Sequence, residues 1–106
     1  MEYFDTGTQK RPQFNYIGPS QTRTGPDSYG DATVDYRTGW HVYGLLWTGS
    51  RLVPYLDGQP YPDVAATENL PESALTVILN LSVRDGGAPE VGAQMQVDWV
   101  RVWGPG

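Results

Sequence analysis

The side chains with chemistry to offer in this chain are carboxylates and amides. Glu2 stands near the N-terminus, Gln13 and Asn15 alternate in the run QFNYI, and Asn80 sits among apolar neighbours in ILNLSV. A carboxyl group can donate or accept a proton, and an amide can hydrogen-bond a polar ligand. Leaving a buried amide unsatisfied costs on the order of 1–3 kcal/mol, so Asn80 needs either a ligand in a cleft or backbone partners. His41 is the only histidine, and neither a histidine metal site nor a Ser-His-Asp set is visible.

Composition narrows the class of partner. The chain has 106 residues, with 7 Lys and Arg against 12 Asp and Glu, a formal net charge of -5 and no run of basic residues. Nucleic acids and anionic membranes attract basic surfaces, so neither is expected as a partner, and a neutral ligand fits better. The absence of cysteine excludes disulfides, thiol catalysis and cysteine zinc sites. No window of 18 apolar residues and no signal-peptide pattern is found in the chain.

Glycine and proline divide the chain into short runs. There are 13 Gly and 9 Pro, and the apolar or alternating runs between them indicate an all-β chain. We predict a single domain, residues 1–106, with four to six antiparallel strands. Pro54 makes its run an edge strand or a bulge, and residues 18–30 read as a long loop. The expected strands are 13–17, 31–36, 39–48, 51–57, 74–83 and 95–103, with residues 2–5 as a candidate strand tail.

Four segments occur in an order that resembles glycoside hydrolase family 16. The run WHVYGLLWTGSRLVPYLDGQPY carries a His-x-Tyr strand that leads through Trp and a hairpin to Tyr55, Asp57 and Gly58. QFNY resembles the run after the catalytic strand of bacterial lichenases, LTVILNLSV the family's apolar strand, and MQVDWVRVW its closing strand. The resemblance is to the C-terminal half of lichenase- and laminarinase-like endo-β-glucanases. It implies an antiparallel concanavalin A-like jelly roll, a β-sandwich, present here as an incomplete half domain.

The resemblance gives Glu2 a catalytic role. The family's catalytic strand carries Glu-x-Asp-x-Glu or Glu-x-Asp-x-x-Glu, and the spacing to QFNY puts Glu2 at the acid/base position. The nucleophile and the Asp would then precede Met1. Retaining glycosidases need two carboxyl groups roughly 5–5.5 Å apart. We therefore expect the parent protein to hydrolyse β-1,3 or β-1,3-1,4 glucan, and the isolated chain to be inactive. A half sandwich would also expose an apolar sheet face that a homodimer could cover.

The resemblance also implies which residues hold the sugar. Gln13, Asn15 and Asn80 would hydrogen-bond sugar hydroxyls, and Trp40, near a strand start, could line the cleft. The alternatives are a solvated polar strand face for the first two, a backbone-satisfied core amide for Asn80, and packing for Trp40.

Two further residues have a structural interpretation. His41 would be structural at its family position. Asp98 resembles a position that some lichenases use for a structural calcium, but one carboxylate is far short of the six to eight oxygens that Ca²⁺ takes. No cofactor is therefore expected from this chain, and Asp98 should pair with Arg101 or face solvent.

Two other classes of function stay open. A non-catalytic carbohydrate-binding module on the same scaffold fits the acidic charge and the Trp and Tyr content equally well, and an interaction or structural β-domain would have no sugar role. Binding of β-glucan without turnover would favour the module, and no binding to glucans or galactans would favour the structural domain. The family resemblance further implies a secreted protein whose partner is a polysaccharide.

Overall fold

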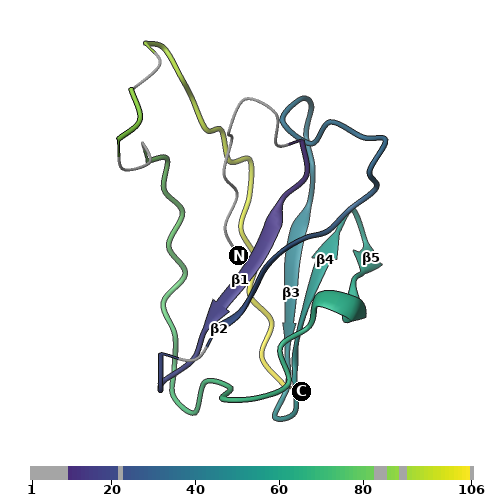
Figure 1. Cartoon of the computed structure of the whole chain (residues 1–106), viewed down its shortest axis with the longest axis vertical. Helices are drawn as coiled ribbons and strands as arrows, with labels where there is room; N and C mark the ends of the chain where they lie inside the picture. Colours follow the sequence, from purple (N-terminus) through teal and green to yellow (C-terminus); the bar gives the residue numbers. More distant parts are fainter. Residues whose placement is uncertain (1–9, 22, 83–85, 89–90, 106) are drawn as a thin grey trace. The chain divides into compact units, whose positions relative to one another are not determined.

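The computed structural model describes residues 10–21, 23–82, 86–88 and 91–105, and the chain divides into two compact units, 1–74 and 75–106. Every strand pair is antiparallel, and no α-helix occurs in these ranges, so the all-β prediction is confirmed. The prediction of one domain stays a prediction. The elements are β1 (Gln13–Ile17), β2 (Arg23–Ser28), β3 (Tyr43–Trp47), β4 (Leu52–Leu56), β5 (Gln59–Pro60) and the 3₁₀ turn η1 (Pro62–Val64), shown in Figure 1.

The first sheet pairs β1 with β2. β1 has its predicted bounds, but β2 lies inside the segment 18–30 that was predicted to be a loop, so that prediction was wrong. The strand accommodates Gly25 and Pro26 because the register shifts between Phe14 and Tyr16, a bulge that absorbs the extra residue. Gly25 has φ +89°, and a Cβ there would lie 2.3 Å from the Phe14 carbonyl oxygen, so only glycine fits.

The second sheet has the order β3-β4-β5, with Tyr43 opposite Leu56 and Trp47 opposite Leu52. β4 is therefore central, which corrects the prediction that Pro54 makes it an edge strand or a bulge. Pro54 lies on the β5 side of the ladder, where its carbonyl accepts a bond from the Tyr61 N–H at 2.9 Å. An N–H group at this position would point to the β5 side as the carbonyl does, just past the end of β5. The proline therefore removes no hydrogen bond between β4 and β3.

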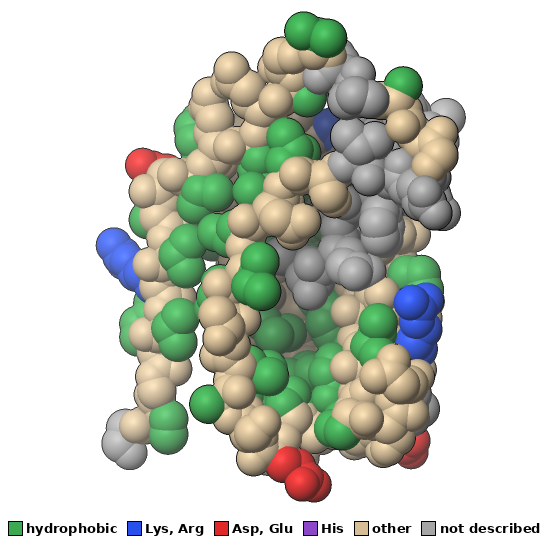
Figure 2. All heavy atoms as spheres, turned by 90° about the vertical axis from the view of Figure 1, so that its left-hand side faces the viewer, with side chains coloured by type: hydrophobic (Ala, Val, Ile, Leu, Met, Phe, Trp, Pro, Cys, Tyr) green, Lys and Arg blue, Asp and Glu red, His purple; other side chains and the backbone are tan. Residues whose placement is uncertain are grey.

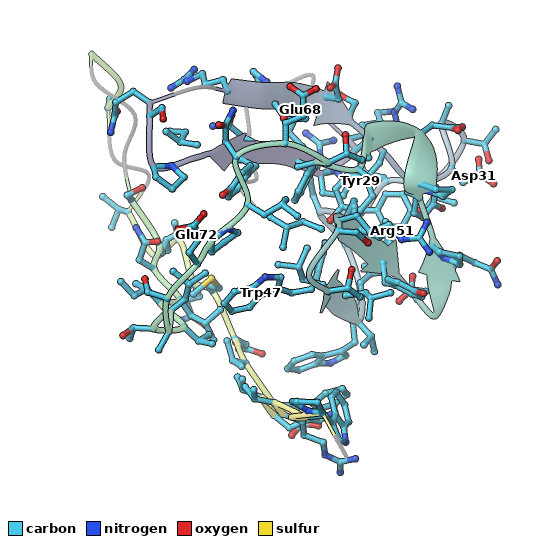
Figure 3. All side chains as sticks on the ribbon, turned by 90° about the horizontal axis from the view of Figure 1, so that it is seen from below. Tyr29, Asp31, Trp47, Arg51, Glu68 and Glu72 are labelled. Atoms are coloured by element: carbon cyan, nitrogen blue, oxygen red, sulfur yellow. The ribbon has the colours of Figure 1, made fainter. Side chains whose placement is uncertain are left out.

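The core lies between the two sheets, which appear as two layers in Figure 3, with Tyr29 in the space between them. Phe14 on β1 and Leu52 and Leu56 on β4 are each at most 3% exposed, because the alternating residues of both strands point into this space. The chain between β2 and β3 closes one side of the layers through Tyr36. The buried cluster consists of Phe14, Tyr29, Tyr36, Leu52, Leu56 and Ala66.

Residues 31–36 form turns instead of the predicted strand. The Val34 N–H bonds to the Asp31 carbonyl at 3.2 Å, and the Asp31 carboxylate accepts the Thr33 N–H at 2.8 Å. The Asp35 carboxylate accepts the Arg37 N–H at 3.1 Å in the same way. Aspartate side chains that capture nearby N–H groups favour turns over ladders, which the apparent alternation did not reveal.

The described residues of the second unit, 75–82, 86–88 and 91–105, contain no assigned strand or helix. The predictions of strands at 74–83 and 95–103 are therefore not met there, since a strand exists only where a neighbouring segment completes its ladder. Their apolar side chains remain exposed, with Ile78 at 76% and Val102 at 77%. In the first unit Leu45 is 50% and Trp47 42% exposed on β3, and hydrophobic side chains are plentiful at the surface drawn in Figure 2.

Candidate functional site

The polar face of β1 is the part of the predicted site that the structure describes most fully. Phe14 and Tyr16 contact the core cluster. Gln13 and Asn15 consequently lie on the other face of the strand, as the alternation predicts, and both are half-buried. The Oδ1 atom of Asn15 is itself buried. Two amides held on one face of a short, bulged strand can hydrogen-bond a polar ligand from a fixed position.

The other predicted site residues lie apart from this face in the chain. Glu2 lies outside the described residues. Trp40 is 67% exposed and precedes β3 of the second sheet. Asn80 is exposed and belongs to the second unit. The structure therefore brings Gln13 and Asn15 together and places Trp40 and Asn80 on other segments.

An ion pair that sequence reasoning missed joins the start of β3 to the turn after β4. His41 Nδ1 lies 2.8 Å from Asp57 Oδ2, and His41 Nε2 lies 2.9 Å from the Thr38 carbonyl oxygen. The second Asp57 oxygen accepts the Val42 N–H at 2.8 Å. Because both ring nitrogens face acceptors, the arrangement is satisfied in full only by the doubly protonated ring.

Each member of this pair stabilises the charged form of the other. The hydrogen bond that His41 donates to the Asp57 carboxylate raises the pKa of His41 above its usual 6.5, against the opposing effect of partial burial. Burial works to raise the pKa of Asp57, but the Val42 N–H and His41 outweigh it and lower that pKa below 3.8. The pair could have been predicted from the register of the hairpin. Because Tyr43 pairs with Leu56, extending the ladder by one residue places Val42 opposite Asp57, and His41 is the neighbour of Val42. The structural role that the resemblance gives His41 agrees with this geometry.

A pocket of about 470 Å³ lies at the other end of the first unit, where the chain turns between strands. Three segments line it: Pro19 and Ser20 from the β1–β2 turn, Thr48 and Gly49 from the β3–β4 hairpin, and residues 69–72. Figure 3 looks onto this end and labels Glu72 together with Glu68 on the same segment. Among the described residues of the sequence-predicted site, Gln13, Asn15, Trp40 and Asn80, none lines this pocket.

The described residues hold no group of three or more His, Cys, Asp or Glu that could bind a metal ion. Asp98 is exposed, and Arg101 instead lies over the Trp99 ring at 5.1 Å. No helix within these ranges has the length and apolar character to cross a bilayer.

Comparison with known proteins gives one result. The family model described as glycosyl hydrolases family 16 matches residues 1–101, almost the whole of the 106-residue chain. Searches of curated proteins and of solved structures found no significant match. The match covers Glu2, both sheets and the second unit as far as residue 101 in one continuous span. With its antiparallel all-β fold, the chain belongs to glycosyl hydrolases family 16.

Proposed function

We propose that this chain is the acid/base and sugar-binding half of a retaining endo-glycosidase that hydrolyses β-1,3 or β-1,3-1,4 glucan. The observation that carries the proposal is the family match over residues 1–101, which makes a glycosidase acting on a polysaccharide the function class. The net charge of -5 supports a neutral polymer over an anionic one.

Glu2 is the proposed general acid/base. In a retaining mechanism a carboxylic acid protonates the leaving glycosidic oxygen while a carboxylate attacks the anomeric carbon. The acid, now ionised, then removes a proton from the water that releases the glycosyl-enzyme intermediate. This carboxyl pair needs no metal or other cofactor. We assign the attacking carboxylate to sequence outside these 106 residues.

Gln13 and Asn15 are proposed to hydrogen-bond sugar hydroxyls beside the scissile bond. Their common face on β1 and their partial burial support this role, since amides held at fixed, half-buried positions can hydrogen-bond sugar hydroxyls. The exposed indole of Trp40 would stack on a sugar ring, and Asn80 would add a further amide contact. Holding the sugar in a fixed position lowers the barrier to the reaction, because it removes the entropy cost of orientation.

The test separates binding from turnover. The 106-residue chain should bind β-1,3-glucan and mixed-linkage β-1,3-1,4-glucan in an affinity gel and release no reducing sugar from either. The protein expressed from the whole reading frame should release reducing sugar, and Glu2→Gln in that protein should abolish the release without weakening binding. Failure of the chain to bind any glucan or galactan would contradict the proposal.

A non-catalytic carbohydrate-binding module is the second candidate. The 67% exposure of Trp40 favours it, because a stacking ring and two amides bind sugar without a catalytic pair. Because the proposed half enzyme should itself bind glucan without turnover, the 106-residue chain alone does not separate the two candidates. The whole reading frame does, since a module gives no reducing sugar from it either, with or without Glu2→Gln.

Assembly and location are proposed on physical grounds. The exposed apolar residues of β3, such as Leu45 and Trp47, support a homodimer that covers this strand, because soluble monomers rarely leave such patches open. Sedimentation should then give a concentration-dependent mass that Leu45→Ser lowers, and a monomer at every concentration would contradict it.

A polymeric glucan substrate also supports secretion, which detection of the native protein in the culture medium would test.

A further inference from the structure

The pocket at the turn end of the first unit has no role in the function proposed above. It encloses about 470 Å³ between the β1–β2 turn, the β3–β4 hairpin and residues 69–72. That volume lies within the range of small-molecule sites, roughly 300–1,000 Å³. We propose that this pocket is an accessory site for a short stretch of neutral oligosaccharide. The identity of the sugar as a β-glucan rests on the proposed function, whereas the site itself rests on the pocket.

The walls of the pocket are held in place by tertiary contacts. The Tyr16 hydroxyl on β1 donates a hydrogen bond to the Asn69 carbonyl oxygen at 2.5 Å. Gly18 packs so closely on the same residue that an added Cβ would meet Asn69 O at 2.7 Å and Asn69 Cβ at 2.8 Å. The Thr48 N–H closes the hairpin by donating to the Arg51 carbonyl at 3.0 Å. Tyr16 and Gly18 therefore hold the chain entering the β1–β2 turn against residue 69, and the hairpin wall is closed by its own hydrogen bond. These walls are formed before a ligand arrives, which lowers the entropy cost of binding.

The chemistry of the walls selects the class of ligand. Ser20, Thr48, Asn69 and Glu72 offer two hydroxyls, an amide and a carboxylate, while prolines and Leu70 add apolar surface. None of the described residues that line it is Lys, Arg or His, so an anion has no counter-charge there.

Two further ligand classes fit poorly. One carboxylate does not supply the six to eight oxygens that Ca²⁺ takes. An apolar ligand would offer no hydrogen bond to the Ser20 hydroxyl, the Asn69 amide or the Glu72 carboxylate that it covers. A neutral ligand with many hydroxyls satisfies the polar groups, and the CH faces of its rings cover the prolines.

The test is a titration of the ¹⁵N-labelled 106-residue chain with a β-1,3-glucan tetrasaccharide, followed by amide chemical shifts. We expect saturable shifts at Gly49, Leu70 and Glu72. Glu72→Ala should weaken the affinity reported by these shifts by about tenfold, the scale of losing a hydrogen bond to a charged group. Glu68→Ala is the matched control, because Glu68 is an exposed carboxylate on the same segment that does not line the pocket, and it should leave the affinity unchanged.

The shifts at Gln13 and Asn15 report the proposed catalytic-face binding in the same experiment, so the two proposals fail separately. Shifts at β1 without shifts around the pocket would overturn the accessory site and leave the proposed function standing. Pocket shifts alone, weakened by Glu72→Ala, would support the accessory site and contradict sugar binding at β1. Equal affinity in Glu72→Ala and wild type would overturn the accessory site, provided that the variant keeps the dispersed spectrum of the folded chain. No shift in either region would overturn both.

Discussion

His41 holds two turns together at the scale of single residues, because one ring nitrogen faces Asp57 and the other faces the Thr38 carbonyl. His41→Ala removes both hydrogen bonds and should lower the free energy of unfolding by about 1–2 kcal/mol, with the charge component reduced by solvent screening. Urea denaturation at pH 6 measures this loss. Glu68→Ala, an exposed residue elsewhere, is the control and should not change the midpoint; equal midpoints for both variants would contradict the role given to the pair.

The same pair makes the free energy of unfolding depend on pH. The folded-state pKa of His41 is raised, so its contribution is complete below pH 6.5 and is lost as pH rises through the folded pKa. The folded-state pKa of Asp57 is lowered, so its contribution is present above pH 3.8 and is lost as pH falls through the folded pKa. Wild-type stability should therefore decline as pH rises above about 6.5 and through the folded-state pKa of His41, and His41→Ala should flatten this decline. A slope that survives the substitution would assign the effect to other groups.

Gln13 and Asn15 carry the sugar-binding prediction at the same scale. Each neutral amide hydrogen bond contributes on the order of 0.5–1.5 kcal/mol, so Gln13→Ala and Asn15→Ala should each weaken β-glucan binding by roughly two- to tenfold. Calorimetry with a soluble β-glucan oligosaccharide measures the change. Gln59→Ala, on exposed β5, is the control and should bind as wild type does. Wild-type affinity in both β1 variants would remove the polar face of β1 from the site.

Among the elements, β2 depends most clearly on one residue. Gly25→Ala places a Cβ 2.3 Å from the Phe14 carbonyl oxygen at φ +89°, so the strand pair must open or shift. We expect a loss of at least about 2 kcal/mol in the free energy of unfolding, since strain and lost ladder bonds add. Gly49→Ala is the matched control, because a Cβ there meets nothing within 4 Å. Similar denaturation midpoints for the two variants would mean that the bulge relaxes without cost.

The elements also show what a sequence alone can predict. Alternation identifies β1, whose side chains follow a period of two, and the turn residues on either side identify β4, which is buried on both faces. β2 was not predicted because Gly25 and Pro26 are typical of loops. They fit into a strand only because the register of β1 and β2 contains a bulge. The polar face of β1 follows from local alternation, so it was predictable. The pair of His41 and Asp57 joins residues 16 positions apart, and it emerges only once the hairpin register is known.

For the whole molecule, the division into two units predicts two classes of backbone amides, one that exchanges hydrogen slowly and one that exchanges it fast. In the first unit Leu52 exchanges two hydrogen bonds with Ala66, at 2.8 and 3.0 Å, around a core that is at most 9% exposed. The segments 75–82 and 91–105 belong to no sheet among the described residues, and their apolar side chains lie open to solvent. Amides in hydrogen-bonded, buried strands open only with the larger part of the stability of their unit, whereas unpaired amides exchange at nearly the rate of a free chain. Hydrogen exchange followed by mass spectrometry should therefore show slow exchange for peptides covering 52–56 and fast exchange for those covering 75–82.

Protection at 75–82 that grows with protein concentration would indicate pairing with a second copy, and protection independent of concentration would contradict the two-class prediction, because this segment would then be paired within one chain.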